Sequence, residues 1–182
     1  MRLVGTEPVR SISGTMARMG ELLGADDLVM GLDYSQLYVR GWSDFRTRSG
    51  IGPVAERAMS SPERVAGDGW VIVVISPHRN NFDMHVRVER WSGPPPDDLD
   101  GWQEAVEGPL TVEGGLLVLD SPTMTPVSTP VPDGHYAARV CGRGFVNRGD
   151  TPTTTPGDVW RVQIWPAVQV RRLRAWTGSI DA

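Results

Sequence analysis

Three stretches of the sequence hold residue types that do chemistry in other proteins. The first, HRNNFDMH at 78–85, contains two histidines, and on a strand Asp83 and His85 would share a face as two corners of a metal site. That face continues into Arg87 and Glu89, which is typical of a solvated surface, and no cysteine or further histidine cluster completes a ligand shell. We therefore expect no metal and no cofactor.

The other two stretches are incomplete in the same way. CGRGF at 141–145 has the Gly-x-Gly spacing of a phosphate-binding turn, but no helix is expected after it to hold an anion. No serine lies in a nucleophile elbow, and Cys141 has no base nearby in the sequence. The arginines of VRRLRAWTG at 170–178 lack the interleaved aromatic residues of a nucleic-acid surface. We expect no nucleic-acid binding and no enzymatic activity. An enzyme with an unrecognised active site is an alternative that ranks after protein binding and small-molecule binding.

Charge is distributed unevenly along the chain. Every basic side chain apart from histidine is an arginine, and none occurs between Arg90 and Arg139, where eight carboxylates lie. An acidic surface repels nucleic acid and attracts a basic protein, and an aromatic residue within it suits an interface anchor. We therefore predict a partner-binding site there, with a solvated loop as the alternative. Its residues are Asp97, Asp98, Asp100, Trp102, Glu104 and Glu107.

A second candidate surface lies in GLDYSQLYVRG at 31–41. Its alternation predicts one strand over 28–40, with Tyr34, Gln36 and Tyr38 on the same face. Gln36 is the only amide on that face, and it either bonds to the backbone of the following loop or contacts a partner or ligand. The tyrosines could also stack on a sugar or another small molecule, which gives an alternative function.

Short strands should position these residues. WVIVVIS at 70–76 is apolar on both faces and predicts a strand covered on both sides, paired in a hairpin with the alternating FDMHVRVERW at 82–91. The inward side chains of the later strands should include Ala138, Val140, Trp160, Val162 and Ile164. Apart from one turn in the long 41–69 loop, helix signals are few. The pattern predicts an all-β fold, an antiparallel β-sandwich of about seven to nine strands with little helix.

Length and composition limit the organisation. A chain of 182 residues fits one domain, which we place at 28–168 between an N-terminal extension, 1–27, and a tail, 169–182. No apolar run approaches the ~20 residues that span a membrane, and the start lacks the apolar core of a signal peptide. The single cysteine fits a reducing compartment. We therefore expect a cytoplasmic protein that does not bind membranes.

The order of these segments resembles the competence protein J family and its actinobacterial relatives. LDYSQLYV is similar to the aromatic-x-Gln-aromatic strand that opens the family's domain, and WVIVVIS with FDMHVRVERW resembles its central hairpin. WQEAVEGPL leads into VPDGHYAARVCGRG, which resembles the Pro-x-Gly-x-Tyr strand, and VWRVQIWPA resembles the closing strand. The likeness covers roughly residues 28–168.

The founding member of that family inhibits the DNA-entry nuclease of competent bacteria by binding it. The resemblance therefore implies a non-enzymatic, intracellular protein-binding module, such as a nuclease inhibitor or an immunity-type protein. Its partner would be a protein, for example a basic nuclease or toxin. The alternative is a β-sandwich that binds a small molecule or carbohydrate.

Overall fold

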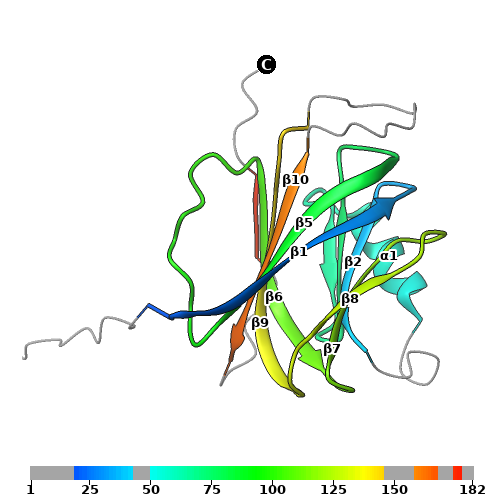
Figure 1. Cartoon of the computed structure of the whole chain (residues 1–182). Coiled ribbons are helices and arrows are strands. Elements are labelled where there is room, and N and C mark those ends of the chain that lie inside the picture. The colour runs from blue at the N-terminus through cyan, green and yellow to red at the C-terminus, as the bar shows by residue number, and fades with distance from the viewer. Residues whose placement is uncertain (1–18, 43–49, 146–157, 168–173, 178–182) are drawn as a thin grey trace, which may run out of the picture.

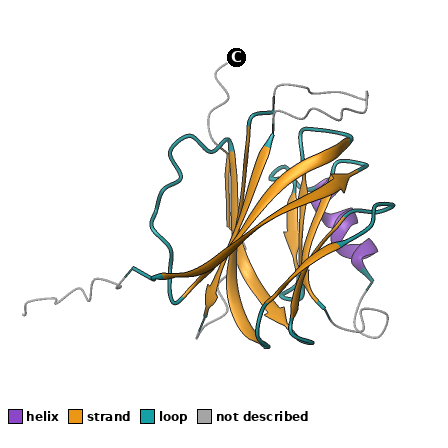
Figure 2. Ribbon diagram, in the orientation of Figure 1, coloured by secondary structure: helices purple, strands orange, loops and turns teal. Residues whose placement is uncertain are grey.

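The computed structural model describes residues 19–42, 50–145, 158–167 and 174–177, and these form two facing β-sheets with one outer helix (Figures 1 and 2). The six-stranded sheet has the order β1 (Leu22–Leu32), β5 (Asn81–Trp91), β10 (Val159–Pro166), β9 (Gly134–Arg143), β6 (Glu104–Val112) and β11 (Arg174–Thr177). The five-stranded sheet has the order β3 (Val65–Gly67), β4 (Val71–Ile75), β2 (Gln36–Gly41), β7 (Leu116–Asp120) and β8 (Val127–Pro130). Helix α1 (Ile51–Ser60) covers the five-stranded sheet from outside.

The predicted all-β sandwich is confirmed, but the six-stranded sheet is not fully antiparallel. β10 runs parallel to β5, with Val159 opposite His85 and Ile164 opposite Arg90, while β10 and β9 are antiparallel. The described residues hold eleven strands, more than the predicted seven to nine. Part of the excess comes from β3, which lies in the predicted loop at 41–69, and from β11, which lies beyond the predicted domain.

The prediction of one strand over 28–40 is wrong. β1 ends at Leu32 in one sheet and β2 begins at Gln36 in the other. Tyr34 and Ser35 form the turn between them, with φ of 50° and 62°, and the Gln36 amide donates to the Asp33 carbonyl at 3.0 Å. Turns with two positive φ values usually carry Asn or Gly, so Tyr-Ser gave no turn signal.

The hairpin predicted over 70–91 is also wrong. β4 belongs to the five-stranded sheet and β5 to the six-stranded sheet, so the segment 76–80 crosses between the layers. Both strands have the patterns expected of them: β4 is buried on both faces, and β5 alternates. A turn signal alone cannot tell whether the next strand pairs with the last one or crosses to another sheet.

The main core lies between the inner faces of the sheets. Trp160, Val162 and Ile164 point into it, as do Ala138 and Val140, all as predicted from the alternation. A smaller core lies between the five-stranded sheet and α1. Its members are Val54, Ala55 and Ala58 of α1 with Tyr38, Ala66, Val71, Val73 and Ile75. This second core explains why WVIVVIS is apolar on both faces.

The helix is longer than the single turn expected from the sequence. It runs from Ile51 to Ser60, and Val54, Ala55 and Ala58 form the apolar stripe that faces the sheet. No helix in the described part of the chain is long and apolar enough to cross a membrane.

Candidate functional site

The predicted acidic site lies largely in the loop at 92–103, which crosses the outer face of the six-stranded sheet (Figure 1). We call these residues the strap. The Asp98 carboxylate accepts two hydrogen bonds from Arg161 of β10, at 2.7 and 2.8 Å. These hydrogen bonds hold the pKa of Asp98 below its usual range. At the end of the strap, the backbone amide of Gln103 donates a hydrogen bond to the Gly142 carbonyl at 3.0 Å.

Trp102 and Glu107 are also engaged within the chain. The Trp102 ring lies against two guanidinium groups, 4.8 Å from that of Arg143 and 4.6 Å from that of Arg161. Glu107 lies on β6 and is only 6% exposed. Its carboxylate accepts a hydrogen bond from Arg139 at 3.2 Å, and Arg139 also donates to the Pro96 carbonyl of the strap at 3.1 Å.

The fold therefore brings arginines that are distant in the sequence next to the acidic segment. Among the predicted site residues, Asp97 and Asp100 are exposed and half of the Asp98 side chain is exposed. Glu104, at the start of β6, is partly buried. A partner role for this segment stays a prediction, and the two exposed aspartates are the members most available for it.

Cys141 should resist alkylation in the folded protein. It is fully buried on β9 opposite Arg161, and burial raises the pKa of its thiol. With iodoacetamide at pH 8, we expect native Cys141 to react slowly, because thiolate is the reactive form. Asp98→Asn should speed labelling about three- to fivefold, because a half-exposed ion pair contributes under about 1 kcal/mol to holding the strap.

Asp97→Asn is the matched control, since it removes the same charge from the neighbouring, exposed position. Mass spectrometry follows the adduct over time, and labelling after unfolding in urea gives the reference rate. Rapid labelling of the native protein, or equal rates for the two variants, would show that the Asp98–Arg161 pair does not protect Cys141.

A different set of side chains converges at one end of the sandwich, which we call the loop end. It comprises the β1–β2 turn, the crossing segment 76–80 and the loop after β7. The Ser35 amide donates to the Arg79 carbonyl and the Ser76 amide to the Ser35 carbonyl, each at 2.8 Å. Together these segments surround a cavity of about 470 Å³. It is lined by Asp33, Tyr34, Arg79, Asn80, Phe82, Thr123 and Met124.

Buried polar groups tie the turn to the loop after β7. Asp33 is 5% exposed, and its carboxylate accepts hydrogen bonds from the hydroxyls of Ser121, at 2.9 Å, and Thr123. The Ser121 hydroxyl also accepts a hydrogen bond from the Asp33 amide at 2.9 Å. These contacts join residues 88 or more positions apart, so the turn is fixed by tertiary structure.

A buried carboxylate supports the crossing segment. Asp158 accepts hydrogen bonds from His78 Nδ1 at 3.0 Å, Asn81 Nδ2 at 2.5 Å and Trp160 Nε1 at 2.9 Å. The His78 ring is buried, and the nearby Ser76 hydroxyl accepts from the His78 amide and not from the ring. This arrangement lacks the serine–imidazole contact of a catalytic triad and serves to position the loop.

Tyr34 is the most unusual residue of the loop end. Its backbone has φ of 50°, a conformation that costs free energy for residues other than glycine, yet the residue is 59% exposed. Phe82, which lines the same cavity, is 39% exposed. Tyr34 therefore combines a strained backbone with an exposed aromatic ring on a hydrogen-bonded support.

Tyr38 belongs to the core between the five-stranded sheet and α1, and Gln36 is hydrogen-bonded to it. Both residues are on β2, whereas Tyr34 lies in the turn before that strand. Tyr38 is buried under α1 and donates to Gln36 Oε1, and Gln36 Nε2 lies 3.9 Å from the Met59 sulfur. Burial, with help from Asp120 and Asp33, raises the pKa of Tyr38 to about 12. Gln36 therefore joins the sheet to the 41–69 segment through side chains, and the two tyrosines do not form a shared stacking platform.

The metal corner considered from the sequence does not assemble. Asp83 and His85 are exposed on β5, while His78 is buried against Asp158. Within the ranges that the structure describes, no three His, Cys, Asp or Glu residues are placed to hold a metal ion.

Sequence reasoning missed most of the loop end. Arg79 comes from the turn before β5, Phe82 from the start of β5 and Met124 from a proline-rich loop over forty residues further along the chain. The one local signal was Gly31, where an added Cβ would lie 2.7 Å from the Met124 sulfur.

The fold and the loop end define a two-sheet β-sandwich with several interstrand loops gathered at one end. The chain is similar in structure to ComJ of Bacillus subtilis, an inhibitor of the DNA degrading activity of NucA, with a TM-score of 0.54 and 12% identity over 82% of this chain and 100% of ComJ. It is also similar to the protein called crocagin biosynthetic gene J, with a TM-score of 0.53 and 11% identity over 79% and 97% of the two chains.

At these identities the likeness establishes the fold alone. The fold implied by the resemblance to the competence protein J family is therefore confirmed. No protein-family model matches the sequence, and no curated protein matches it.

Proposed function

We propose that this chain is a non-enzymatic protein-binding module of the inhibitor or immunity type, with a basic protein such as a nuclease or toxin as its partner. The observation that carries the proposal is Tyr34, an exposed aromatic residue held in a strained turn by buried hydrogen bonds. The fold shared with ComJ, an inhibitor, supports the same function. A cytoplasmic location fits the single, buried cysteine.

The loop end supplies the features of an interface hot spot. Tyr34, Phe82 and Arg79 line one cavity, and aromatic residues and arginine are the types most enriched among hot spots. The supporting hydrogen bonds order the loops before binding, which lowers the entropy cost of association. A complementary side chain of the partner would fill the cavity between the rings.

The exposed carboxylates of the strap have a separate role in this proposal. Asp97 and Asp100 lie outside the loop-end cavity, so we assign them long-range attraction of a basic partner. Such charges act mainly on the association rate, and salt screens them. Trp102 would then stabilise the strap, because its ring already packs on Arg143 and Arg161.

Photo-crosslinking tests the proposal directly. A benzoylphenylalanine at position 34 should capture a basic protein in the native host, and the same group at Leu22 should not. Leu22 is a matched control because it is exposed and lies at the opposite end of β1. The captured protein is then tested for DNA degradation with and without this chain. Equal capture at both positions, or none at position 34, would contradict the loop end as the interface.

With the partner in hand, Tyr34→Ala should weaken binding about thirtyfold, the loss expected when a hot-spot side chain worth about 2 kcal/mol is removed. Leu22→Ala should leave the dissociation constant unchanged. Surface binding measurements decide between these outcomes.

The double substitution Tyr34→Asn and Ser35→Gly separates strain from contact. Asn-Gly is the preferred sequence for such a turn, so the double variant should unfold at higher urea, with a gain of about 1 kcal/mol, yet bind the partner as weakly as Tyr34→Ala. A variant that is more stable and still binds fully would show that Tyr34 is not part of the interface.

A further inference from the structure

A second cavity lies at the end of the sandwich opposite the loop end. It opens where β5 and β10 finish and where β9 begins, whereas the loop end lies where β5 and β10 begin. We call it the end cleft. Its volume is about 450 Å³, within the range of small-molecule sites. It is lined by Leu23, Arg90, Trp91, Gly115, Pro130, Val131, Pro132, Tyr136, Ile164 and Pro166.

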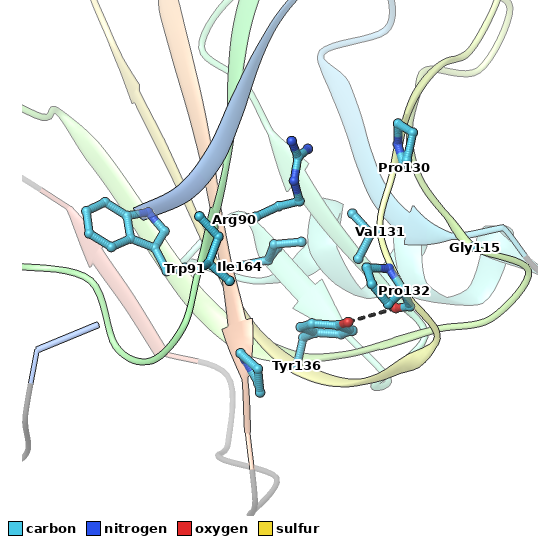
Figure 3. Close-up of a pocket in the computed structure, with 10 residues that line it drawn as sticks. Arg90, Trp91, Gly115, Pro130, Val131, Pro132, Tyr136 and Ile164 are labelled. Atoms are coloured by element: carbon cyan, nitrogen blue, oxygen red, sulfur yellow. Dashed lines mark hydrogen bonds between the residues drawn. The ribbon is translucent and has the colours of Figure 1, made fainter. Parts of the chain in front are cut away.

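Most of this lining is apolar and stiff. Figure 3 shows Arg90, Ile164, Val131 and Tyr136 around the space between the two sheets. The Tyr136 hydroxyl donates to the Pro132 carbonyl at 2.7 Å, which fixes the ring against the proline (Figure 3). Proline and a hydrogen-bonded ring lose little conformational freedom when a ligand binds, so the cleft is largely preformed.

Arg90 is the charged residue of this lining, and the polar group that it forms with Asp26 and Thr129, which we call the wall, joins the two sheets. The Arg90 Nη1 atom donates to the Asp26 carboxylate and, at 3.1 Å, to the Thr129 hydroxyl, which also donates to Asp26. Asp26 belongs to β1, Arg90 to β5 and Thr129 to β8. The edge strands of the two sheets are therefore clamped together beside the cleft.

This wall carries no net charge. The hydrogen bond from Arg90, with that from Thr129, lowers the pKa of Asp26, so its carboxylate is ionised and neutralises the guanidinium. The wall therefore presents no unbalanced charge to the cleft. A charged ligand would lose its hydration there and gain no compensating ion pair.

We propose that the end cleft binds a neutral, mostly apolar small molecule, with its apolar body against Ile164, Val131 and Tyr136. The site is independent of the loop end, so binding here and partner binding stand or fall separately. The proposed ligand site is therefore not the one formed by Tyr34 and Tyr38, which was considered from the sequence.

Two fluorescent probes with one skeleton test the charge preference. N-phenyl-1-naphthylamine is neutral, and 8-anilino-1-naphthalenesulfonate adds a sulfonate to the same rings. The neutral probe should bind the full chain with a Kd on the order of 10 µM, as expected for a ligand of its size. The sulfonate should bind at least tenfold more weakly. Equal binding of the two probes, or no binding of the neutral one, would overturn the proposal.

Asp26→Asn tests whether the wall causes this preference. The variant leaves the Arg90 charge without its counter-ion, so binding of the sulfonate should strengthen about five- to tenfold while binding of the neutral probe stays within twofold. Asp27→Asn is the matched control, because it removes the same charge on the adjacent, exposed residue that pairs with Arg87. If both variants change sulfonate binding equally, the preference does not come from this wall.

Leu23→Glu locates the neutral probe. Leu23 lines the cleft and is 67% exposed, so the substitution should leave the fold intact, as a urea melt will verify. It places a charge against the apolar body and should weaken binding of the neutral probe at least tenfold. The control Leu22→Glu, one residue away and outside the lining, should not. Unchanged binding in Leu23→Glu would place the probe elsewhere.

Discussion

Asp158→Asn should lower the free energy of unfolding by about 3 kcal/mol, because it disrupts a buried carboxylate that accepts three hydrogen bonds. Asparagine keeps the size but offers one acceptor oxygen, and its NH₂ group would face a donor. At least one of His78, Asn81 and Trp160 would lose its partner in a site without water access. Urea unfolding followed by tryptophan fluorescence gives the change.

Asp83→Asn is the control for this substitution. This substitution makes the same chemical change at an exposed position of β5, so the free energy of unfolding should change by no more than about 0.5 kcal/mol. If the Asp158 variant unfolds at the same urea concentration as the control, the buried network contributes nothing to stability. Because Asp158 holds the crossing segment, its substitution should also weaken partner binding at the loop end.

Glu107→Leu should cost a similar amount, about 3 kcal/mol, for a different reason. Glu107 and Arg139 form an ion pair on the outer face of the six-stranded sheet, with under a tenth of either side chain exposed. Removing the carboxylate leaves the Arg139 charge buried without its counter-ion, with the Pro96 carbonyl and the Trp165 ring as its remaining described partners. The free energy of unfolding from urea melts measures the loss.

The double variant Glu107→Leu and Arg139→Met decides whether the pair or its burial is responsible. Two apolar side chains of similar size remove both charges, so the double variant should recover most of the loss and lie within about 1 kcal/mol of the wild type. If the double variant is less stable than Glu107→Leu alone, the pair itself holds the sheet and the strap together. With the single variant Arg139→Met measured as well, the double-mutant cycle gives the coupling energy.

The sequence predicted those elements whose pattern is local. Alternation along β5, β9 and β10 identified which side chains point inward, since strand residues alternate by geometry. The two-sided apolar run of β4 indicated a covered strand before the covering helix was known. The turn at Tyr34 and the crossing at 76–80 were not predictable in this way. The local sequence around Tyr34 is also compatible with a continuous strand, and the sequence at 76–80 is also compatible with the turn of a hairpin.

The candidate sites also differ in whether their pattern is local in the sequence. The carboxylates around Trp102 were visible as a run of acidic residues, but Arg139 of β9 pairs with Glu107 and Arg161 of β10 pairs with Asp98. Part of the charge that is uncompensated along the sequence is therefore compensated in space. The loop end and the end cleft were missed, because each gathers side chains from strands and loops that are distant in the chain.

By itself, the sequence determined the all-β class and the inward faces of the strands, because hydrophobic periodicity acts within a few residues. Tertiary structure alone decided the parallel pairing of β5 with β10, the pairing of the strap with arginines and the placing of Tyr34 at an exposed, strained turn. The reason is physical. Pairing and charge compensation depend on which strands become neighbours, and that is set by the packing of the whole chain.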